Sequence, residues 1–287
     1  MPSARPDSGA ARTPRAVDRR DPDYPSGLRD LRDAPPMVHI RGEISPRESA
    51  IAIVGSRAAT PYGQKIARDL ARDLAGLGFA IVSGLARGID AAAHRGALET
   101  GGRTIAVLAG GLDHVAPRHH VKLAEEIAST GGLLTEWPSG PPAQPGMFVR
   151  RNRLIAAISA AVVVVEADER SGALSTAAAA RRLGRLLFAV PGDIDRPSSR
   201  GCLALLRGGA RVCGSAADVA GALPSLAATP RALVLGAVLA EPRGADEIAL
   251  TAGVPIDQAL AELLSLEWSG AIEACPGGNW RRAGSVA

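Results

Sequence analysis

Two segments between Ile51 and His94 end short β-branched runs with glycines, serines and arginines. The first reads IAIVGSR, from Ile51 to Arg57, and the second reads AIVSGLARGIDAAAH, from Ala80 to His94. In each, the run predicts a buried strand, a turn of small residues follows, and a helix begins. Such units gather backbone N–H groups at one edge of a parallel sheet, where proteins bind anions. The anion could be a nucleotide, a sugar phosphate or a polynucleotide backbone.

The turn residues of both segments suit phosphate. Gly55 permits a tight turn, Ser56 offers a hydroxyl group, and the planar guanidinium of Arg57 matches a phosphate, although a generic turn with a surface arginine is the alternative. The second turn lets the backbone approach a ligand beside a helix N-terminus, through Ser83, Gly84, Ala86 and Gly88. Neither GxGxxG nor GxxxxGK(S/T) occurs, which disfavours the usual routes to NAD and ATP, and no cofactor is predicted.

Three arginines, Arg150, Arg151 and Arg153, crowd the start of a predicted helix over 149–159. Cations oppose the helix dipole at an N-terminus by about 0.3–1 kcal/mol each. We therefore expect an anion, or acidic side chains from elsewhere in the chain, to offset them. A solvated run of charge is the alternative.

Aromatic residues are few, and three of them lie beside these glycines and arginines. Tyr62, Trp137 and Phe148 follow predicted strands, and Asn152 sits among the arginines. Aromatic faces next to basic groups suit the stacked bases of a single strand. Core packing is the favoured alternative for Trp137.

Other polar residues leave alternatives open. In SGALSTA, Ser171 with Gly172 and Thr176 either caps the next helix or donates to a phosphate. Asp90 and His94 are four residues apart on one helix, and we favour structural hydrogen bonds over a general-base pair for them. The three cysteines have no CxxC spacing and no nearby histidine, which predicts small buried thiols in a reducing compartment and no metal site.

A parallel sheet is needed to position these groups. Apolar runs predict strands at 51–55, 79–84, 104–109, 132–136, 161–167 and 186–190. Helical patterns alternate with them at 62–77, 89–100, 119–130, 149–159, 174–183 and 202–207. This alternation predicts an α/β fold, an extended Rossmann-like doubly wound sheet with right-handed crossovers.

The flanking segments predict a three-part organisation. Residues 1–20 are expected to be a disordered leader, 21–226 the Rossmann-like domain, and 227–287 a C-terminal winged-helix domain. A linker at 224–230 precedes helices at 232–240, 245–252 and 256–267, and two strands with a turn then form the wing.

The net charge differs among three successive segments of the chain. Residues 1–48 carry a net charge of +1, residues 49–227 carry +6, and residues 228–287 carry −3. The last tail helix is predicted to expose Asp257, Gln258, Glu262 and Glu267 and to pack through Ile256, Leu260, Leu263 and Leu264. Acidic groups there would be repelled by duplex DNA, so we expect this domain to contact protein.

Longer segments of the chain resemble one family. The strongest are VSGLARGIDAAAHRGAL, TIAVLAGGLD, FVRRNRLIA, VVVEADERSGALSTA and SSRGCLALLRGGA. Together they resemble the DNA-processing proteins called DprA or Smf, from Tyr24 to about Arg282. The resemblance implies a core that binds single-stranded DNA, forms a homodimer near SSRGCLALLRGGA and loads the RecA recombinase onto incoming DNA during natural transformation.

The loops and the resemblance together predict which residues contact DNA. They are Gly55, Ser56, Arg57, Ser83, Gly84, Ala86, Gly88, Phe148, Arg151, Asn152, Arg153, Ser171, Gly172 and Thr176. No catalytic residue is predicted. The double change Arg57→Ala with Arg151→Ala is expected to weaken DNA binding with little loss of folding.

We therefore expect a cytoplasmic, non-enzymatic mediator that binds single-stranded DNA, protects it and loads RecA. No apolar run reaches about 18 residues, so no membrane span is predicted. The alternative is a nucleotide-processing enzyme of the phosphoribohydrolase type that uses Asp90 or Glu166, although its PGGxGTxxE motif is absent. A duplex-DNA regulator that uses the winged helix is a third possibility.

Overall fold

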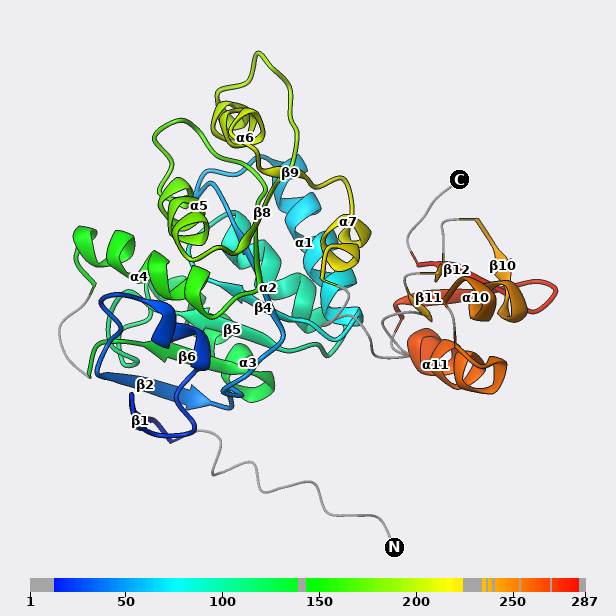
Figure 1. The fold of residues 1–287 in the computed structure, drawn as a ribbon, viewed down its shortest axis with the longest axis horizontal. Coiled ribbons are helices and arrows are strands. Elements are labelled where there is room, and N and C mark those ends of the chain that lie inside the picture. The colour runs from blue at the N-terminus through cyan, green and yellow to red at the C-terminus, as the bar shows by residue number, and fades with distance from the viewer. Residues whose placement is uncertain are drawn as a thin grey trace, which may run out of the picture.

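A nine-stranded mixed sheet organises the larger part of the chain (Figure 1). The computed structural model describes residues 13–138, 143–223, 234–235, 237–238, 241–252, 254–268 and 270–283. The strand order is β1-β2-β6-β5-β4-β3-β7-β8-β9. The strands are β1 (Arg15–Asp18), β2 (Met37–Gly42), β3 (Ala50–Val54), β4 (Ala80–Ser83), β5 (Thr104–Val107), β6 (Gly132–Thr135), β7 (Ala161–Val164), β8 (Leu186–Ala189) and β9 (Arg211–Val212).

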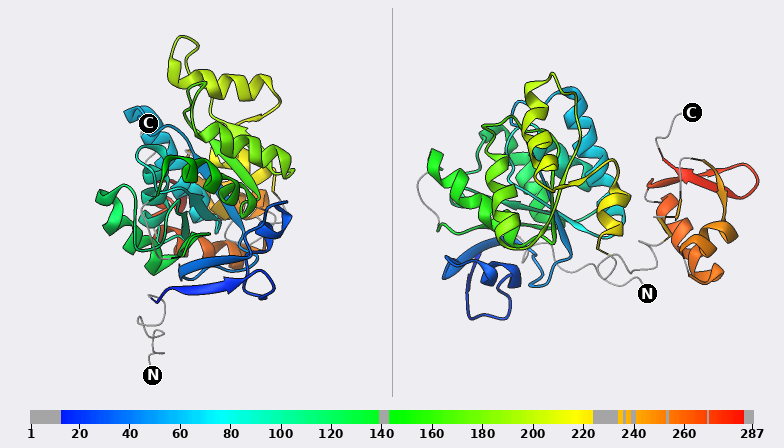
Figure 2. Two further views of the ribbon diagram at one scale, coloured as in Figure 1. Left: turned by 90° about the vertical axis from the view of Figure 1, so that its left-hand side faces the viewer. Right: turned by 45° about the horizontal axis from the view of Figure 1, so that its top comes forward.

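Helices cover both faces of this sheet (Figure 2). They are α1 (Pro61–Gly76), α2 (Ile89–Glu99), α3 (Val121–Thr130), α4 (Pro145–Ala157), α5 (Ala173–Arg182), α6 (Pro197–Arg207) and α7 (Ala216–Gly221). Ile51 and Ile53 of β3 pack into one apolar cluster with α1, α2 and α7, whereas Ala52 and Val54 pack into another with α4, α5 and α6. Alternate β3 residues therefore face opposite helical layers, which confirms the predicted doubly wound core.

All six predicted strands are confirmed as β3 to β8, which pair in parallel with their neighbours in this group. Every residue of β3 to β7 is buried, as continuous apolar runs indicate. All six strands end one to three residues before the predicted boundary.

The N-terminal edge of the sheet was not predicted. β2 pairs antiparallel with β6, and β1 pairs antiparallel with β2. The prediction of disorder over 1–20 is therefore wrong for β1, which buries Val17. β1 reads RAVD, and so short a run with two apolar residues cannot be distinguished from a loop by periodicity.

Two helices begin a full turn or more earlier than predicted. α4 begins at Pro145 instead of residue 149, and α6 begins at Pro197 instead of residue 202. Proline is favoured in the first turn of a helix, where its missing N–H has no intrahelical partner. The predicted starts followed the apolar pattern, which sets in only after the first turn.

The C-terminal residues form a second sheet of three strands, in the order β10-β12-β11. Its elements are β10 (Arg243–Gly244), α10 (Ala245–Ala252), α11 (Ile256–Trp268), β11 (Ile272–Cys275) and β12 (Asn279–Arg282). These elements confirm two helices and the wing of the predicted winged helix. The predicted linker at 224–230, the boundary at 226–227 and most of the predicted helix at 232–240 lie outside the described residues.

The packing side of α11 differs from the prediction. Its buried residues are Ala259, Leu263 and Leu266. Of the four residues predicted to pack, Ile256, Leu260 and Leu264 are exposed instead. Leucines on two sides of one helix make the buried side ambiguous in the sequence.

Among the described residues, no single helix has the length and apolar character needed to cross a membrane; α10 and α11 meet that test only as a pair bent by 107°. All three cysteines are free thiols, and Cys202 and Cys213 are buried while Cys275 is half-buried. The prediction of buried thiols is thus confirmed for two of the three.

The order of connections reverses between β3 and β7. Along the chain, β4, β5 and β6 add to one side of β3, whereas β7 and β8 add to the other. β3 and β7 pair in parallel from Ile51 with Ala161 to Val54 with Val164, so the loops that follow them start side by side. Ligands of open α/β sheets bind outside the carboxyl ends of the strands at such a switch point.

Candidate nucleic-acid interface

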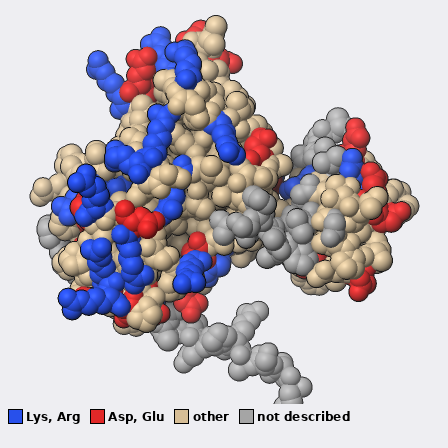
Figure 3. Space-filling model, in the orientation of Figure 1, with Lys and Arg blue, Asp and Glu red and all other residues tan. Residues whose placement is uncertain are grey.

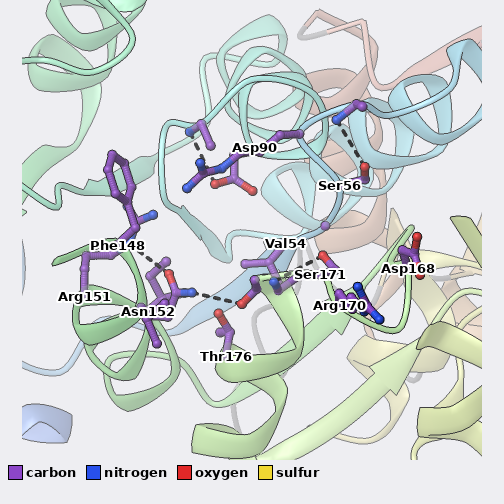
Figure 4. A pocket seen from close by; sticks show the side chains of 18 of the residues that line it. Val54, Ser56, Asp90, Phe148, Arg151, Asn152, Asp168, Arg170, Ser171 and Thr176 are labelled. Atoms are coloured by element: carbon purple, nitrogen blue, oxygen red, sulfur yellow. Dashed lines mark hydrogen bonds between the residues drawn. The ribbon is translucent and has the colours of Figure 1, made fainter. Parts of the chain in front are cut away.

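A cavity of about 600 Å³ lies at this switch point (Figure 4). It opens between the loops that follow β3, β4 and β7 and the first turns of α4 and α5. Ten predicted site residues line it: Gly55, Ser56, Arg57, Ala86, Phe148, Arg151, Asn152, Ser171, Gly172 and Thr176. The other four predicted residues, Ser83, Gly84, Gly88 and Arg153, are not part of its lining.

The loop after β3 presents an exposed cation on an aromatic ring. Ser56 N donates to Glu166 O at 2.7 Å, and a Cβ on residue 55 would lie 2.6 Å from Ile89 Cγ1, so glycine is required there. With the turn fixed in this way, Arg57 projects from it. Its guanidinium carbon lies 4.7 Å from the centroid of the Phe148 ring, a cation–π contact at the cavity.

The loop after β4 is organised by a buried carboxylate. Asp90 Oδ2 accepts from Gly84 N at 3.1 Å and from Ala86 N at 3.3 Å. Burial raises the pKa of Asp90, while the Arg151 cation and the two amides act in the opposite direction. Ser83 is fully buried and its hydroxyl donates to Ile53 O at 2.6 Å, so Ser83 does not fit the predicted DNA contact.

Gly88→Ala is expected to destabilise the protein by about 1–3 kcal/mol or more. Gly88 has φ +77°, and a Cβ there would lie 2.3 Å from the carbonyl oxygen of Ser56. Gly78→Ala is the matched control, because Gly78 has φ +87° and no neighbour within 4 Å. Urea unfolding of both variants separates the clash from backbone strain, and equal losses would contradict the close approach of the two loops.

Arg151 connects the loop after β4 to the end of β5. Its side chain is buried, and Nη1 donates to Gly84 O at 2.7 Å and to Val107 O. A Cβ on residue 84 would lie 2.4 Å from Arg151 Nη2, so Gly84 makes room for the guanidinium. Burial lowers the pKa of Arg151 to about 10, and Asp90 opposes that shift. The structure does not support the expectation that Arg151 can be removed with little loss of folding.

Arg153 points away from the cavity. Its Nε lies 2.7 Å from Asp33 Oδ2, and its Nη2 lies 2.8 Å from Glu136 Oε2. The hydrogen bond from Arg153 holds the pKa of Asp33 below its ordinary value. Because α4 begins at Pro145, the arginines lie beyond its first turn, and the premise of three cations at a helix N-terminus is wrong. Acidic side chains from elsewhere compensate Arg153.

Asn152 and the turn before α5 form the opposite wall. The Asn152 Nδ2 group donates to Gly172 O at 3.1 Å and to a serine hydroxyl of α5, so this amide ties α4 to α5. Ser171 Oγ accepts from Ala173 N at 3.3 Å within the turn, but the N-cap residue of α5 is Gly172, so Ser171 does not cap the helix as the first alternative predicted; Ser171 lines the cavity. Thr176 is buried at the cavity surface.

The candidate acid–base side chains form hydrogen bonds with other residues of the protein. Glu166 is buried and accepts from the Thr60 hydroxyl at 2.6 Å and from Thr60 N at 2.9 Å. His94 Nδ1 lies 2.7 Å from Thr104 Oγ1, and burial lowers the pKa of His94 to about 3. The general-base pairing of Asp90 with His94 is therefore not formed, which agrees with the favoured structural interpretation.

Sequence reasoning missed two charged residues of the cavity, Asp168 and Arg170. A signal for Arg170 was present, because it is adjacent to Ser171 in the loop after β7, as Arg57 is adjacent to Ser56 in the loop after β3. On the face shown in Figure 3, Lys and Arg gather over the α/β core, and Asp and Glu are prominent on the smaller C-terminal unit. The cavity thus opens on a core of positive net charge.

Two family models match the chain. DNA recombination-mediator protein A matches residues 15–224, and the DprA winged helix domain matches residues 217–278. The DNA processing protein DprA of Mycobacterium tuberculosis is 47% identical over 262 residues, which cover 85% of this chain and 67% of that protein. Protein Smf of Escherichia coli is 38% identical over 90% of this chain and 75% of that protein.

Two solved structures share the fold. DNA processing protein A from Helicobacter pylori, described for its single-stranded DNA binding mode, is 30% identical with a TM-score of 0.67 and covers 76% of this chain and 98% of that one. The Streptococcus pneumoniae protein is 36% identical with a TM-score of 0.67, over 72% and 73% of the two chains. The family models cover the doubly wound sheet and the C-terminal unit up to residue 278, and the relatives match most of the chain, so this chain belongs to the DNA recombination-mediator protein A (DprA/Smf) family of DNA-processing proteins.

Proposed function

We propose that this chain binds single-stranded DNA in the switch-point cavity and acts as a cytoplasmic, non-enzymatic recombination mediator. In this proposal it forms a homodimer, protects incoming DNA and loads RecA onto it during natural transformation. The Helicobacter pylori relative supports the DNA-binding part, since its structure was described for a single-stranded DNA binding mode. The observation that carries the proposal is the contact between Arg57 and Phe148.

The Arg57–Phe148 pair matches two groups of a single strand, its phosphates and its unpaired bases, and the second of these is not accessible in a duplex. Arg57 is an exposed cation suited to a phosphate, and the half-buried Phe148 ring beside it is a surface on which an unpaired base can stack. The bases of a duplex are already paired and stacked, so an aromatic ring gains little from them. Arg170 and the Ser171 turn extend the polar wall beyond one phosphate.

The carboxylates of the alternative enzyme hypothesis have other roles in the structure. Asp90 accepts hydrogen bonds from the amides of Gly84 and Ala86, and Glu166 accepts from Thr60. Each thereby holds a loop in place. These contacts favour a binding site over a phosphoribohydrolase site.

The test is salt-dependent binding of the full chain to single-stranded and duplex oligonucleotides of equal length. We expect single strands to bind more tightly, with a log–log salt slope of about −0.7 per phosphate contacted. A flat salt response, a preference for duplex, or release of free base from nucleoside monophosphates would contradict the proposal. Solution mass tests the homodimer, and RecA filament formation on DNA with and without this chain tests loading.

A further inference from the structure

The helix α11 carries an apolar row on its exposed side. Ile256, Leu260, Leu264 and Trp268 follow one another at intervals of four residues, so they lie in one row along the helix. Their exposed fractions are 47%, 39%, 61% and 94%. We name these four residues the α11 ridge.

The α11 ridge is not the side on which the helix packs. Ala259, Leu263 and Leu266 fill that role and are fully buried. Folding of the C-terminal unit therefore does not account for the ridge. A row of large apolar side chains that ends in an almost fully exposed tryptophan is typical of a protein-binding surface, because Trp dominates the energetic centres of interfaces.

The charge of α11 limits what can cover the ridge. The helix contains Asp257, Glu262 and Glu267 and neither lysine nor arginine. A negative helix repels the phosphates of duplex DNA and the headgroups of an anionic membrane. It also repels a second copy of itself, since both copies would bring Asp257 and Glu267 beside the ridge together.

The arginines in the described part of the C-terminal unit are engaged elsewhere. Arg243 pairs with Glu247 of α10, and Arg281 pairs with Glu273 of β11. Arg282 is largely buried and donates to two backbone carbonyl oxygens.

Within the described part of the C-terminal unit, Glu267 accepts a hydrogen bond from Trp280 Nε1 at 3.3 Å, and no ion pair reaches the α11 carboxylates. Asp257 and Glu267 are three residues from Leu260 and Leu264 and therefore flank the ridge, whereas Glu262 lies on the opposite side of the helix.

We propose that the α11 ridge binds a basic amphipathic helix of a partner protein. Such a helix would offer apolar residues at intervals of four and lysines or arginines beside them, which complement both the row and the carboxylates. Rows with this spacing on both helices pack at a crossing angle of about −50°. The ridge contains no residue of the cavity, so the proposal does not depend on DNA binding.

The test uses the full chain and two labelled helical peptides with the same apolar residues, one with lysines and one with glutamates at the polar positions. Fluorescence anisotropy is expected to show binding of the lysine peptide at least about tenfold tighter than that of the glutamate peptide, weakening as salt rises. Leu264→Ser is expected to weaken it about tenfold or more, as loss of an interface centre does.

Leu250→Ser is the matched control, because Leu250 is 85% exposed on α10 and lies outside the ridge. Both changes are at exposed positions, and thermal unfolding checks that each variant folds. Equal binding of the two peptides, or equal effects of the two substitutions, would overturn the proposal. Binding to anionic vesicles or to duplex DNA that depends on the ridge would also overturn the proposal, as would a doubling of the solution mass that Leu264→Ser abolishes. Each of these results would show that something other than a basic helix covers the ridge.

Discussion

Replacing Arg151 by alanine is expected to lower the free energy of unfolding by about 3–5 kcal/mol, because it removes two hydrogen bonds from a buried charged group, each of which contributes about 1.5–3 kcal/mol. The guanidinium bonds Gly84 O and Val107 O and partly compensates the buried Asp90. Without it, two carbonyl oxygens lose a donor and the carboxylate loses its cation. Chemical denaturation measures the loss, and DNA binding should fall with it because the loop after β4 is no longer held.

The loss is expected to depend on pH in a defined direction. Burial raises the pKa of Asp90 above its ordinary 3.8, and removing Arg151 raises it further. Between the ordinary pKa of 3.8 in the unfolded chain and the raised pKa in the folded protein, Asp90 binds a proton in the folded state that it does not bind in the unfolded state. The free energy of unfolding therefore falls as pH rises through this range. Arg151→Ala should therefore be least destabilising near pH 4 and most destabilising at neutral pH.

Arg150→Ala provides the control on the same helix. The Arg150 side chain is 54% exposed, and its partner Glu136, whose side chain is 3% exposed, keeps its ion pair with Arg153, so removal of Arg150 should change stability by about 1 kcal/mol or less. A second control is Asp90→Asn combined with Arg151→Met, which removes both charges and should recover part of the stability. If Arg151→Ala unfolds at the same denaturant concentration as Arg150→Ala, the buried role of Arg151 is wrong.

The contrast between Arg57 and Arg151 shows which property of a residue the sequence could not predict. Both are arginines near strand–turn–helix units, and the sequence predicts the same phosphate contact for each. Arg57 follows a glycine in a loop and is exposed, whereas Arg151 lies on the inner side of α4 and is buried. Which side of a helix faces the core depends on where the helix sits on the sheet, and no local pattern contains that information.

Burial periodicity predicted the central strands because each buries an unbroken apolar run between helices. The same rule could not predict β1, because this strand contains only two apolar residues and is recognised only by its pairing with β2. The ion pair of Arg153 could not be predicted for a related reason, since its partner Asp33 is distant in sequence and approaches only in the folded chain. Contacts of this kind depend on long-range pairing, which residue type and spacing do not encode.

Arg57→Ala and Phe148→Ala are expected to weaken single-strand binding for different reasons. Loss of the Arg57 cation should cost about 1.5–3 kcal/mol, or about tenfold or more in affinity, and reduce the salt slope by about 0.7. Loss of the Phe148 ring should cost about 1–3 kcal/mol per stacked base and leave the slope unchanged. Neither change should alter unfolding by more than a fraction of the Arg151→Ala effect, because both side chains lie at the cavity surface.

Two exposed residues outside the cavity serve as controls. Arg68→Ala removes a cation of α1 that pairs with Glu99, and Tyr62→Ala removes an aromatic ring that is 58% exposed. Neither should change affinity or salt slope appreciably. The double variant of Arg57 and Phe148 should lose less than the sum of the single losses, because the 4.7 Å contact couples the two side chains. Strict additivity, or an altered salt slope in Phe148→Ala, would show that the two side chains do not form one site, and the strand would then have to follow another path across the core.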